Sequence, residues 1–111
     1  MGNEALAGFE LLVMLAAVRL GPEDAYTVSI AEDIRMRTGR PVRRANVYTT
    51  LQRLETKGFI TTAMGEPRPE RGGRPPRLVR VEPEGLETIR ITTAAIQAMI
   101  GKLDWVLERS S

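Results

Sequence analysis

Apolar residues recur at steps of three and four between residues 4 and 20, and this spacing predicts a first helix. The recurring set consists of Leu6, Phe9, Leu12, Val13, Ala16, Ala17 and Leu20. The other face also carries large apolar side chains, so we expect this helix to be buried on more than one side. Gly21 and Pro22 then mark its end.

A second helix is predicted by Ser29 and Glu32, which have the spacing of a capping box. In that motif the serine and glutamate side chains accept hydrogen bonds from backbone amides that the first turn leaves unpaired. We expect this helix to run to about Arg37 and to stop at Gly39, a residue type that readily adopts the left-handed conformation after a helix.

A third helix is predicted from about residue 44 to residue 57, directly before Gly58. Val47, Leu51 and Leu54 share one face of it and are candidate core residues. Two short helices joined by a tight turn are typical of a helix-turn-helix motif.

Two segments rich in Thr, Val and Ile follow, FITTAM at residues 59–64 and RLVRVE at residues 77–82. The connection between them contains RPERGGRPPR at residues 68–77, which by itself has the composition of a flexible linker. Too little chain follows to form a second domain. We therefore interpret the two segments as a β-hairpin with this arginine-rich run at its tip.

The last helix is expected to begin at Pro83, a residue type suited to the first helical position, and to run to about Glu108. Apolar positions and one threonine alternate steps of three and four along it, as in a coiled-coil seam. The seam consists of Leu86, Ile89, Thr93, Ile96, Ile100, Leu103 and Leu107. Packing within one chain would explain such a helix, but we favour docking on a second copy, with Phe9 and Leu12 of the first helix in the same interface.

The composition argues against several classes of chemistry. The chain has no cysteine and no histidine, so thiolate and imidazole metal ligands and the commonest general base are missing. No pairing of nucleophile and base and no phosphate-binding loop stands out. We therefore expect neither an enzyme nor a cofactor or metal site.

The N-terminal sequence does not resemble a targeting signal. Glu4 and Glu10 stand where a signal peptide would be basic. The apolar run over residues 9–18 is shorter than the roughly 20 residues that a membrane-spanning helix needs. We expect a cytoplasmic protein without a membrane partner.

Charge is distributed unevenly along the chain. The net charge is only +2, but twelve of the 16 Lys and Arg residues and three of the 14 acidic residues lie between residues 35 and 80. A strongly basic centre between acidic ends is typical of a surface that contacts nucleic acid. A solvated arginine-rich face is the alternative that charge alone leaves open.

The exposed face predicted for the third helix carries side chains suited to DNA. Arginine can bind guanine through two hydrogen bonds, Asn and Gln can do so with adenine, and a Thr methyl can contact thymine. The candidate DNA-binding residues are Arg43, Arg44, Asn46, Tyr48, Thr49, Gln52 and Arg53 on or beside this helix, and Arg68, Arg71, Arg74 and Arg77 on the hairpin.

These elements in this order predict a mainly α member of the α+β class, a winged helix-turn-helix with an N-terminal helix and a long C-terminal dimerisation helix. We assign residues 1–82 to a winged-helix DNA-binding domain and residues 83–111 to a dimerisation helix packed on the same domain. A chain of 111 residues can build one modest core of this kind.

The sequence resembles the PadR-like transcriptional regulators. The segments that carry the resemblance are AYTVSIAEDI (25–34), TGRPV (38–42), VYTTLQRLETKGFI (47–60), GEPRPERGGRP (65–75) and EPEG (82–85). The resemblance implies a dimeric bacterial repressor in which Tyr48 and its neighbours contact DNA and the C-terminal helix of one copy packs on the N-terminal helix of the other. Thr27 replaces a glycine that is frequent in the family, and Leu78 and Val79 occupy the end of the wing, where paired tyrosines are usual.

The favoured function is a sequence-specific regulator, expected to be a repressor, that binds a palindromic operator on double-stranded DNA as a homodimer. The alternative is a winged-helix module that binds a protein partner and not specific DNA. Some family members bind flat aromatic molecules against a tryptophan, and Ile96 occupies the matching position here. Trp105 and Met99 are the candidates for a small aromatic effector site, although we favour the alternative that Trp105 is an ordinary packing residue or lies at a fraying helix end.

Overall fold

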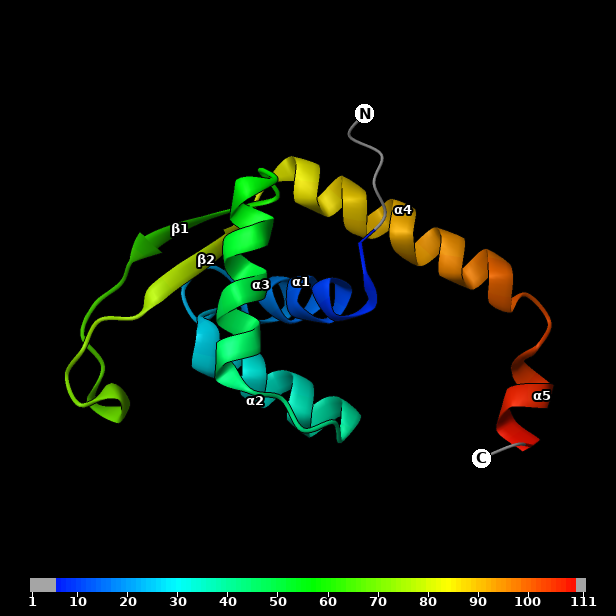
Figure 1. Cartoon of the computed structure of the whole chain (residues 1–111), viewed down its shortest axis with the longest axis horizontal. Coiled ribbons are helices and arrows are strands. Elements are labelled where there is room, and N and C mark those ends of the chain that lie inside the picture. Colours follow the sequence, from blue (N-terminus) through cyan, green and yellow to red (C-terminus); the bar gives the residue numbers. More distant parts are fainter. Residues whose placement is uncertain (1–5, 110–111) are drawn as a thin grey trace.

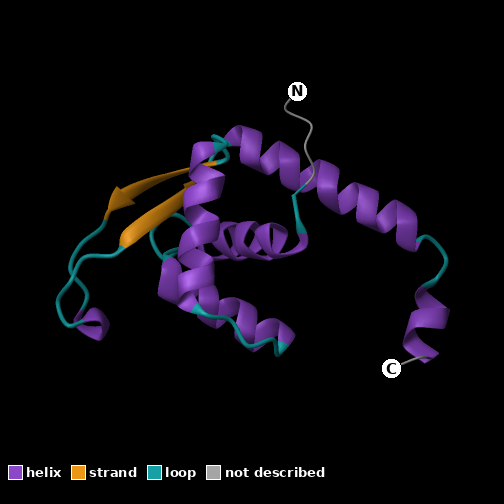
Figure 2. Cartoon of the chain, in the orientation of Figure 1, coloured by secondary structure: helices purple, strands orange, loops and turns teal. Residues whose placement is uncertain are grey.

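The computed structural model describes residues 6–109 and consists of five α-helices and one two-stranded sheet within that range (Figures 1 and 2). The elements are α1 (Gly8–Leu20), α2 (Thr27–Thr38), α3 (Arg44–Thr56), β1 (Ile60–Met64), β2 (Arg77–Val81), α4 (Pro83–Ile100) and α5 (Asp104–Arg109). The first helix thus begins later than its apolar pattern predicts, and the expected start at residue 4 lies outside the described residues. The predicted order of three helices, a hairpin and a C-terminal helix is confirmed.

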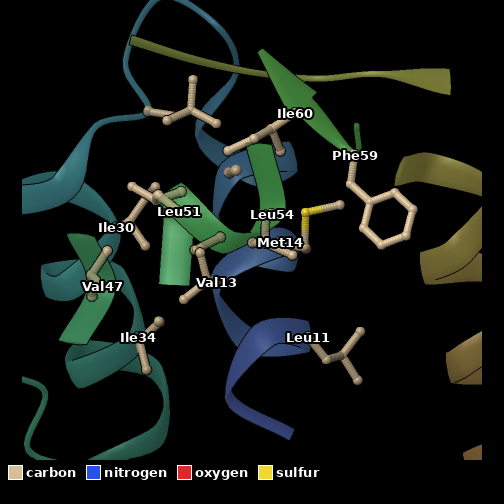
Figure 3. Close-up of a cluster of buried hydrophobic side chains, with 14 of the residues drawn as sticks. Leu11, Val13, Met14, Ile30, Ile34, Val47, Leu51, Leu54, Phe59 and Ile60 are labelled. Atoms are coloured by element: carbon tan, nitrogen blue, oxygen red, sulfur yellow. The ribbon is translucent and has the colours of Figure 1, made fainter. Parts of the chain in front are cut away.

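The core lies where α1, α2 and α3 meet the base of the hairpin (Figure 3). Met14 of α1, Ile30 of α2, Leu54 of α3 and Ile60 of β1 are among its largest fully buried side chains. The three-and-four spacing of apolar residues explains this arrangement, because it places one stripe of each helix against the same centre. The prediction that Val47, Leu51 and Leu54 face the core is confirmed.

The hairpin is antiparallel, with Ile60 opposite Val81 and Met64 opposite Arg77. Beyond the last pair the chain is closed by a hydrogen bond from the Gly65 amide to the Pro76 carbonyl oxygen, 2.8 Å long. Residues 66–75 form the tip, which includes a single 3₁₀ turn. Figure 1 shows the hairpin projecting from the helices beside α3 as the wing of a winged helix.

The base of the wing is also joined to the segment before α2. The Val79 amide donates to the Ala25 carbonyl oxygen at 2.8 Å. The wing is therefore fixed to the helical core by backbone bonding as well as by the buried side chain of Val79.

The start of α2 differs from the capping-box prediction. The helix begins at Thr27, so Ser29 lies inside the first turn; its hydroxyl oxygen accepts a hydrogen bond from the Tyr26 amide at 3.0 Å. Glu32 pairs instead with Arg35 on the helix surface. The predicted end of α2 is confirmed, because Gly39 follows it in the left-handed conformation with φ 74°.

The prediction of one continuous last helix to about Glu108 is wrong. α4 ends at Ile100. The next residue, Gly101, has φ 49° and ψ −119°, a backbone conformation that residues other than glycine avoid. Leu103 therefore lies in a connection, and Leu107 lies on the separate helix α5. Figure 1 shows α4 and α5 as separate helices, so the apolar seam is divided between them.

Only the first half of α4 is docked on the core of its own chain. Gly85, Thr88 and Thr92 are buried, and the Thr92 hydroxyl accepts a hydrogen bond from the Leu6 amide at 3.1 Å. The second half extends away from the other helices (Figure 1). No helix within residues 6–109 combines the length and apolar character that crossing a membrane requires.

Candidate nucleic-acid interface

The outer face of α3 presents the predicted reading residues to solvent. Burial of Val47 and Leu54 turns the opposite side of the helix outward. The exposed side chains are Arg43 and Arg44 at its start, followed by Asn46, Tyr48, Thr49, Gln52 and Arg53. Basic and amide side chains are therefore carried on a helix whose opposite face packs on the core.

These residues divide into two groups. Arg43, Asn46, Thr49 and Arg53 lie together around a hollow of about 380 Å³, which also includes Arg40 from the turn before α3. Arginine and amide donors thus lie along one side of α3, from its start to its last turn. This combination can bind phosphate oxygens or base edges.

Tyr48 and Gln52 line the other side of α3. The Gln52 amide nitrogen donates to the Tyr48 hydroxyl oxygen at 3.3 Å. Both side chains border a groove of about 530 Å³ between α3 and the wing, with Arg71 and Arg77 on its wing side. The groove brings together residues from the two elements that were predicted to contact DNA.

The four wing arginines are not equivalent. Arg68 and Arg71 fold back over the ring of Tyr26, and Arg77 donates to the Thr62 hydroxyl oxygen at 3.1 Å. Arg74 is exposed at the tip. The arginine-rich run is therefore partly a structural contact, which the sequence pattern does not reveal.

Glu10 of α1 contributes to the site, which its position in the sequence did not predict. Its side chain is 6% exposed; one carboxylate oxygen accepts from the Ala7 amide at 2.9 Å and the other from Lys57 Nζ at 3.2 Å. Arg53 approaches the same oxygen at 3.7 Å. A lone acidic residue within the apolar run of the first helix was the signal that could have identified it.

The electrostatics of Glu10 favour the charged form. Burial raises the pKa of its carboxyl, but the hydrogen bonds from Ala7 and Lys57 and the positive charges of Lys57 and Arg53 outweigh burial, so that the pKa lies below its usual value. The carboxylate thereby connects α1 to α3 and forms an ion pair with Arg53, one of the residues predicted to contact DNA.

The residues assigned to dimerisation lie in two environments. Phe9, Leu12 and Ile89 are partly buried and pack against the core. Leu86, Ile96, Leu103 and Leu107 are exposed, and Ile100 is intermediate. A hollow of about 340 Å³ with an apolar lining follows the second half of α4 and includes Ile96, Met99, Ile100 and Leu103.

The two candidate effector residues are both exposed, Met99 by 80% and Trp105 by 60%. Met99 borders the hollow on α4, whereas Trp105 lies on α5 and is not among the residues that line it. Within residues 6–109, no group of three acidic, histidine or cysteine side chains is arranged to hold a metal ion.

Comparison with known proteins identifies the fold. A PadR family transcriptional regulator from Eggerthella lenta is similar to this chain at 26% sequence identity, with a TM-score of 0.66 over 87% of this chain and 81% of that one. A PadR-like regulator from Bacillus cereus matches 87% of this chain and 91% of its own at 13% identity and a TM-score of 0.68.

A PadR-like transcription factor from Bacteroides fragilis is also similar, with 18% identity, a TM-score of 0.60 and coverage of 93% of this chain and 89% of that one. No family model and no curated protein matches the sequence. The likeness therefore rests on structure, and it bears out the resemblance and the winged-helix fold that the sequence motifs predicted.

Proposed function

Because the chain has the fold of the PadR-like transcriptional regulators, we propose that it is a DNA-binding transcriptional regulator. The observation that carries this proposal is the cluster of Arg43, Asn46, Thr49 and Arg53 on the exposed surface of α3, a helix whose other side borders the arginine-tipped wing. In winged-helix proteins these two elements are the ones that meet the duplex.

In this proposal α3 enters the major groove and reads base edges through Asn46, Thr49 and Arg53, while Arg43 and Arg44 neutralise phosphates at its N-terminal end. The groove between α3 and the wing has Tyr48 and Gln52 on one side and Arg77 on the other. In this proposal one DNA backbone strand lies along the groove beside Arg77, on a lining that also includes Glu55 and the apolar side chains of Leu51 and Val79. Arg74, at the wing tip, would then contact the adjacent minor groove or backbone.

We further propose a homodimer that binds a palindromic operator and represses transcription by occupying it. Two copies related by a twofold axis would place their α3 helices in successive major grooves, which requires an inverted repeat in the DNA. The apolar side chains on the second half of α4 support this proposal, because within one chain the described residues leave them exposed.

DNA binding is tested by measuring affinity for a selected operator and for random duplex across a salt series. Asn46→Ala and Thr49→Ala are each expected to lower the binding free energy by about 1–3 kcal/mol at particular base pairs of the operator. The preference for one base over another should be relaxed only at those base pairs. Arg74→Ala should weaken binding to both duplexes alike and lower the salt slope by about 1. Arg90→Ala is the matched control, because it removes one exposed arginine on α4, outside the proposed surface.

A wild-type protein that binds duplex DNA with no salt dependence and leaves no bounded footprint would contradict this function and favour the protein-binding module. If Arg90→Ala lowered the salt slope as much as Arg74→Ala, general charge and not the wing would account for binding.

The dimer is tested by sedimentation of Ile96→Glu combined with Ile100→Glu. Two unpaired carboxylates in an apolar interface should convert the dimer to monomer, since burying a charge without a partner is strongly unfavourable. Gln97→Glu places one negative charge at an exposed position of the same helix and should leave the dimer intact. A wild-type chain that sediments as a monomer at micromolar concentration would refute the dimer.

A further inference from the structure

We propose that Tyr26 is a positioning residue for the wing, and that its ring fixes the arginine-rich tip in the shape that meets DNA. We call Tyr26, Arg68 and Arg71 the wing clamp. Its role in binding rests on the DNA-binding function proposed above, but its existence as a mechanical contact does not.

The clamp consists of two arginines on one aromatic ring. The guanidinium carbon of Arg68 lies 5.4 Å from the centre of the Tyr26 ring and that of Arg71 lies 5.3 Å from it. Both distances are within the range of a cation–π interaction, about 6 Å. The ring itself is buried, with 7% of the residue exposed, so that little water competes for the two cations.

Arg68 is also held by oxygens from the segment before α2. It donates a hydrogen bond to the carbonyl oxygen of Glu23, and one of its nitrogens lies 3.6 Å from a carboxylate oxygen of Asp24. The first arginine of the tip is thus attached to the helical body by charge, by hydrogen bonding and by the ring.

Arg71 connects the Tyr26 ring to Arg74 at the exposed end of the tip. Its Nε contacts the Arg74 carbonyl oxygen at 3.4 Å, and Arg74 Nε contacts the Arg71 carbonyl oxygen at the same distance. The turn between them depends on Gly72 and Gly73, which have φ 67° and φ 84°. Because Arg71 rests on the ring, the position of Arg74 is fixed with it.

The ring is a firm support because the backbone around it is bonded on both sides. The Tyr26 amide donates to Ser29 Oγ at 3.0 Å, and the Tyr26 carbonyl accepts from the Ile30 amide at 2.9 Å. The preceding residue, Ala25, accepts the hydrogen bond from Val79 of the wing. One short segment before α2 therefore holds the wing both at its base and at its tip.

The wing clamp restricts the conformations of the tip in the free protein, before DNA binds. Ordering a flexible arginine-rich loop at the moment of binding would lower affinity, and preorganisation avoids this loss. We expect Tyr26→Leu, which keeps an apolar side chain but removes the ring, to bind every duplex roughly tenfold more weakly at an unchanged salt slope. Removing an arginine that contacts phosphate would instead lower the slope.

The mechanical part is tested without DNA by limited trypsin digestion of the full chain. Arg68 and Arg74 precede Pro69 and Pro75, and trypsin does not cleave before proline, so cleavage within the tip reports on the bond after Arg71. Tyr26→Leu should accelerate this cleavage at least severalfold. Tyr26→Phe keeps the ring and should cleave and bind DNA like the wild type.

Cleavage after Lys57, at the end of α3, is the internal control. If Tyr26→Leu only destabilised the whole domain, the two sites would be cleaved faster in parallel, and the clamp would be refuted. Arg68→Ala provides the same comparison in a chain whose core is unchanged, should the Tyr26 variant fail to fold.

Unchanged cleavage after Arg71 in both Tyr26→Leu and Arg68→Ala, or equal acceleration in Tyr26→Phe, would overturn the proposal. So would a Tyr26→Leu variant that is cleaved faster after Arg71 but binds duplex as tightly as the wild type, because the clamp would then have no role in binding. A wild-type protein that binds no DNA would refute the proposed function, while the digestion still decides whether the clamp exists.

Discussion

Glu10→Gln tests whether the buried carboxylate of α1 holds the reading helix in place. The substitution keeps the size of the side chain and allows the Ala7 hydrogen bond to remain, but it removes the negative charge facing Lys57 and Arg53. Glu32→Gln is the matched control, because the Glu32 side chain is half exposed and pairs with Arg35 on the same helix.

The expected loss follows from the different exposure of the partners. Breaking a fully buried ion pair costs about 3–5 kcal/mol, because the remaining charge is stranded. Here the side chains of Lys57 and Arg53 are 31% and 52% exposed, so both cations can return to water. A hydrogen bond to a charged group contributes about 1.5–3 kcal/mol, and the exposure of both cations lowers this. We therefore expect the unfolding free energy to fall by about 1–2 kcal/mol in Glu10→Gln and by less than about 0.5 kcal/mol in Glu32→Gln.

The assay is urea unfolding of both variants and the wild type at a series of pH values. The pKa of Glu10 is lowered in the folded chain, so its stabilisation is fully present above the unfolded value of about 4.3 and is lost as the pH falls through the folded value. The difference between wild type and Glu10→Gln should therefore shrink below about pH 4. Equal losses for the two variants at pH 7, or a difference that persists at acid pH, would refute the reasoning.

Three further predictions concern packing and the candidate effector. In Gly85→Ala the new Cβ would lie 2.3 Å from the Phe59 carbonyl oxygen, so α4 must shift and the free energy of unfolding should fall by about 1–3 kcal/mol. Gly8→Ala is the control, because its new Cβ would have no neighbour within 4 Å and should not destabilise the chain. Leu54→Ala, at a fully buried position, should lower the unfolding free energy by about 2–5 kcal/mol in the same urea titration. Trp105 fluorescence that stays constant across a panel of planar aromatic molecules would reject an effector site at that side chain.

The sequence predicted most of the fold because the signals for these elements are local. Apolar steps of three and four identified the helices, and glycines at positions 21, 39 and 58 marked three helix ends. The β-prone segments on either side of a Gly- and Pro-rich run identified the hairpin. The exposed face of α3 followed directly from knowing which of its residues are buried, since a helix has a fixed period.

The break after α4 was missed because the apolar seam continues across it. Leu103 and Leu107 keep the spacing of the preceding residues, and that periodicity outweighed the single glycine at position 101. A glycine inside a helical pattern is tolerated in many helices, so its positive φ could not be foreseen from the pattern alone.

The features that hold the site together were not predictable, since they depend on partners distant in the chain. Tyr26 contacts Arg68 and Arg71 only once the hairpin has folded back toward α2, and Glu10 meets Lys57 only once α1 packs beside α3. No periodicity in the sequence encodes such pairs. The sequence therefore indicated which side chains are available to DNA, but not which of them the protein already uses for its own contacts.

The hydrogen bond between the Gly65 amide and the Pro76 carbonyl oxygen closes the loop at the end of the two strands, so the length of the loop does not affect how the strands pair. Because the loop is closed at its base, residues can be added or removed between these two positions without shifting the register of β1 and β2. Doubling such a loop costs only about 0.6 kcal/mol in closure entropy. The length of the tip can thus be changed in an engineered regulator without changing strand pairing or α3, provided that Arg68 and Arg71 keep their contacts with the Tyr26 ring.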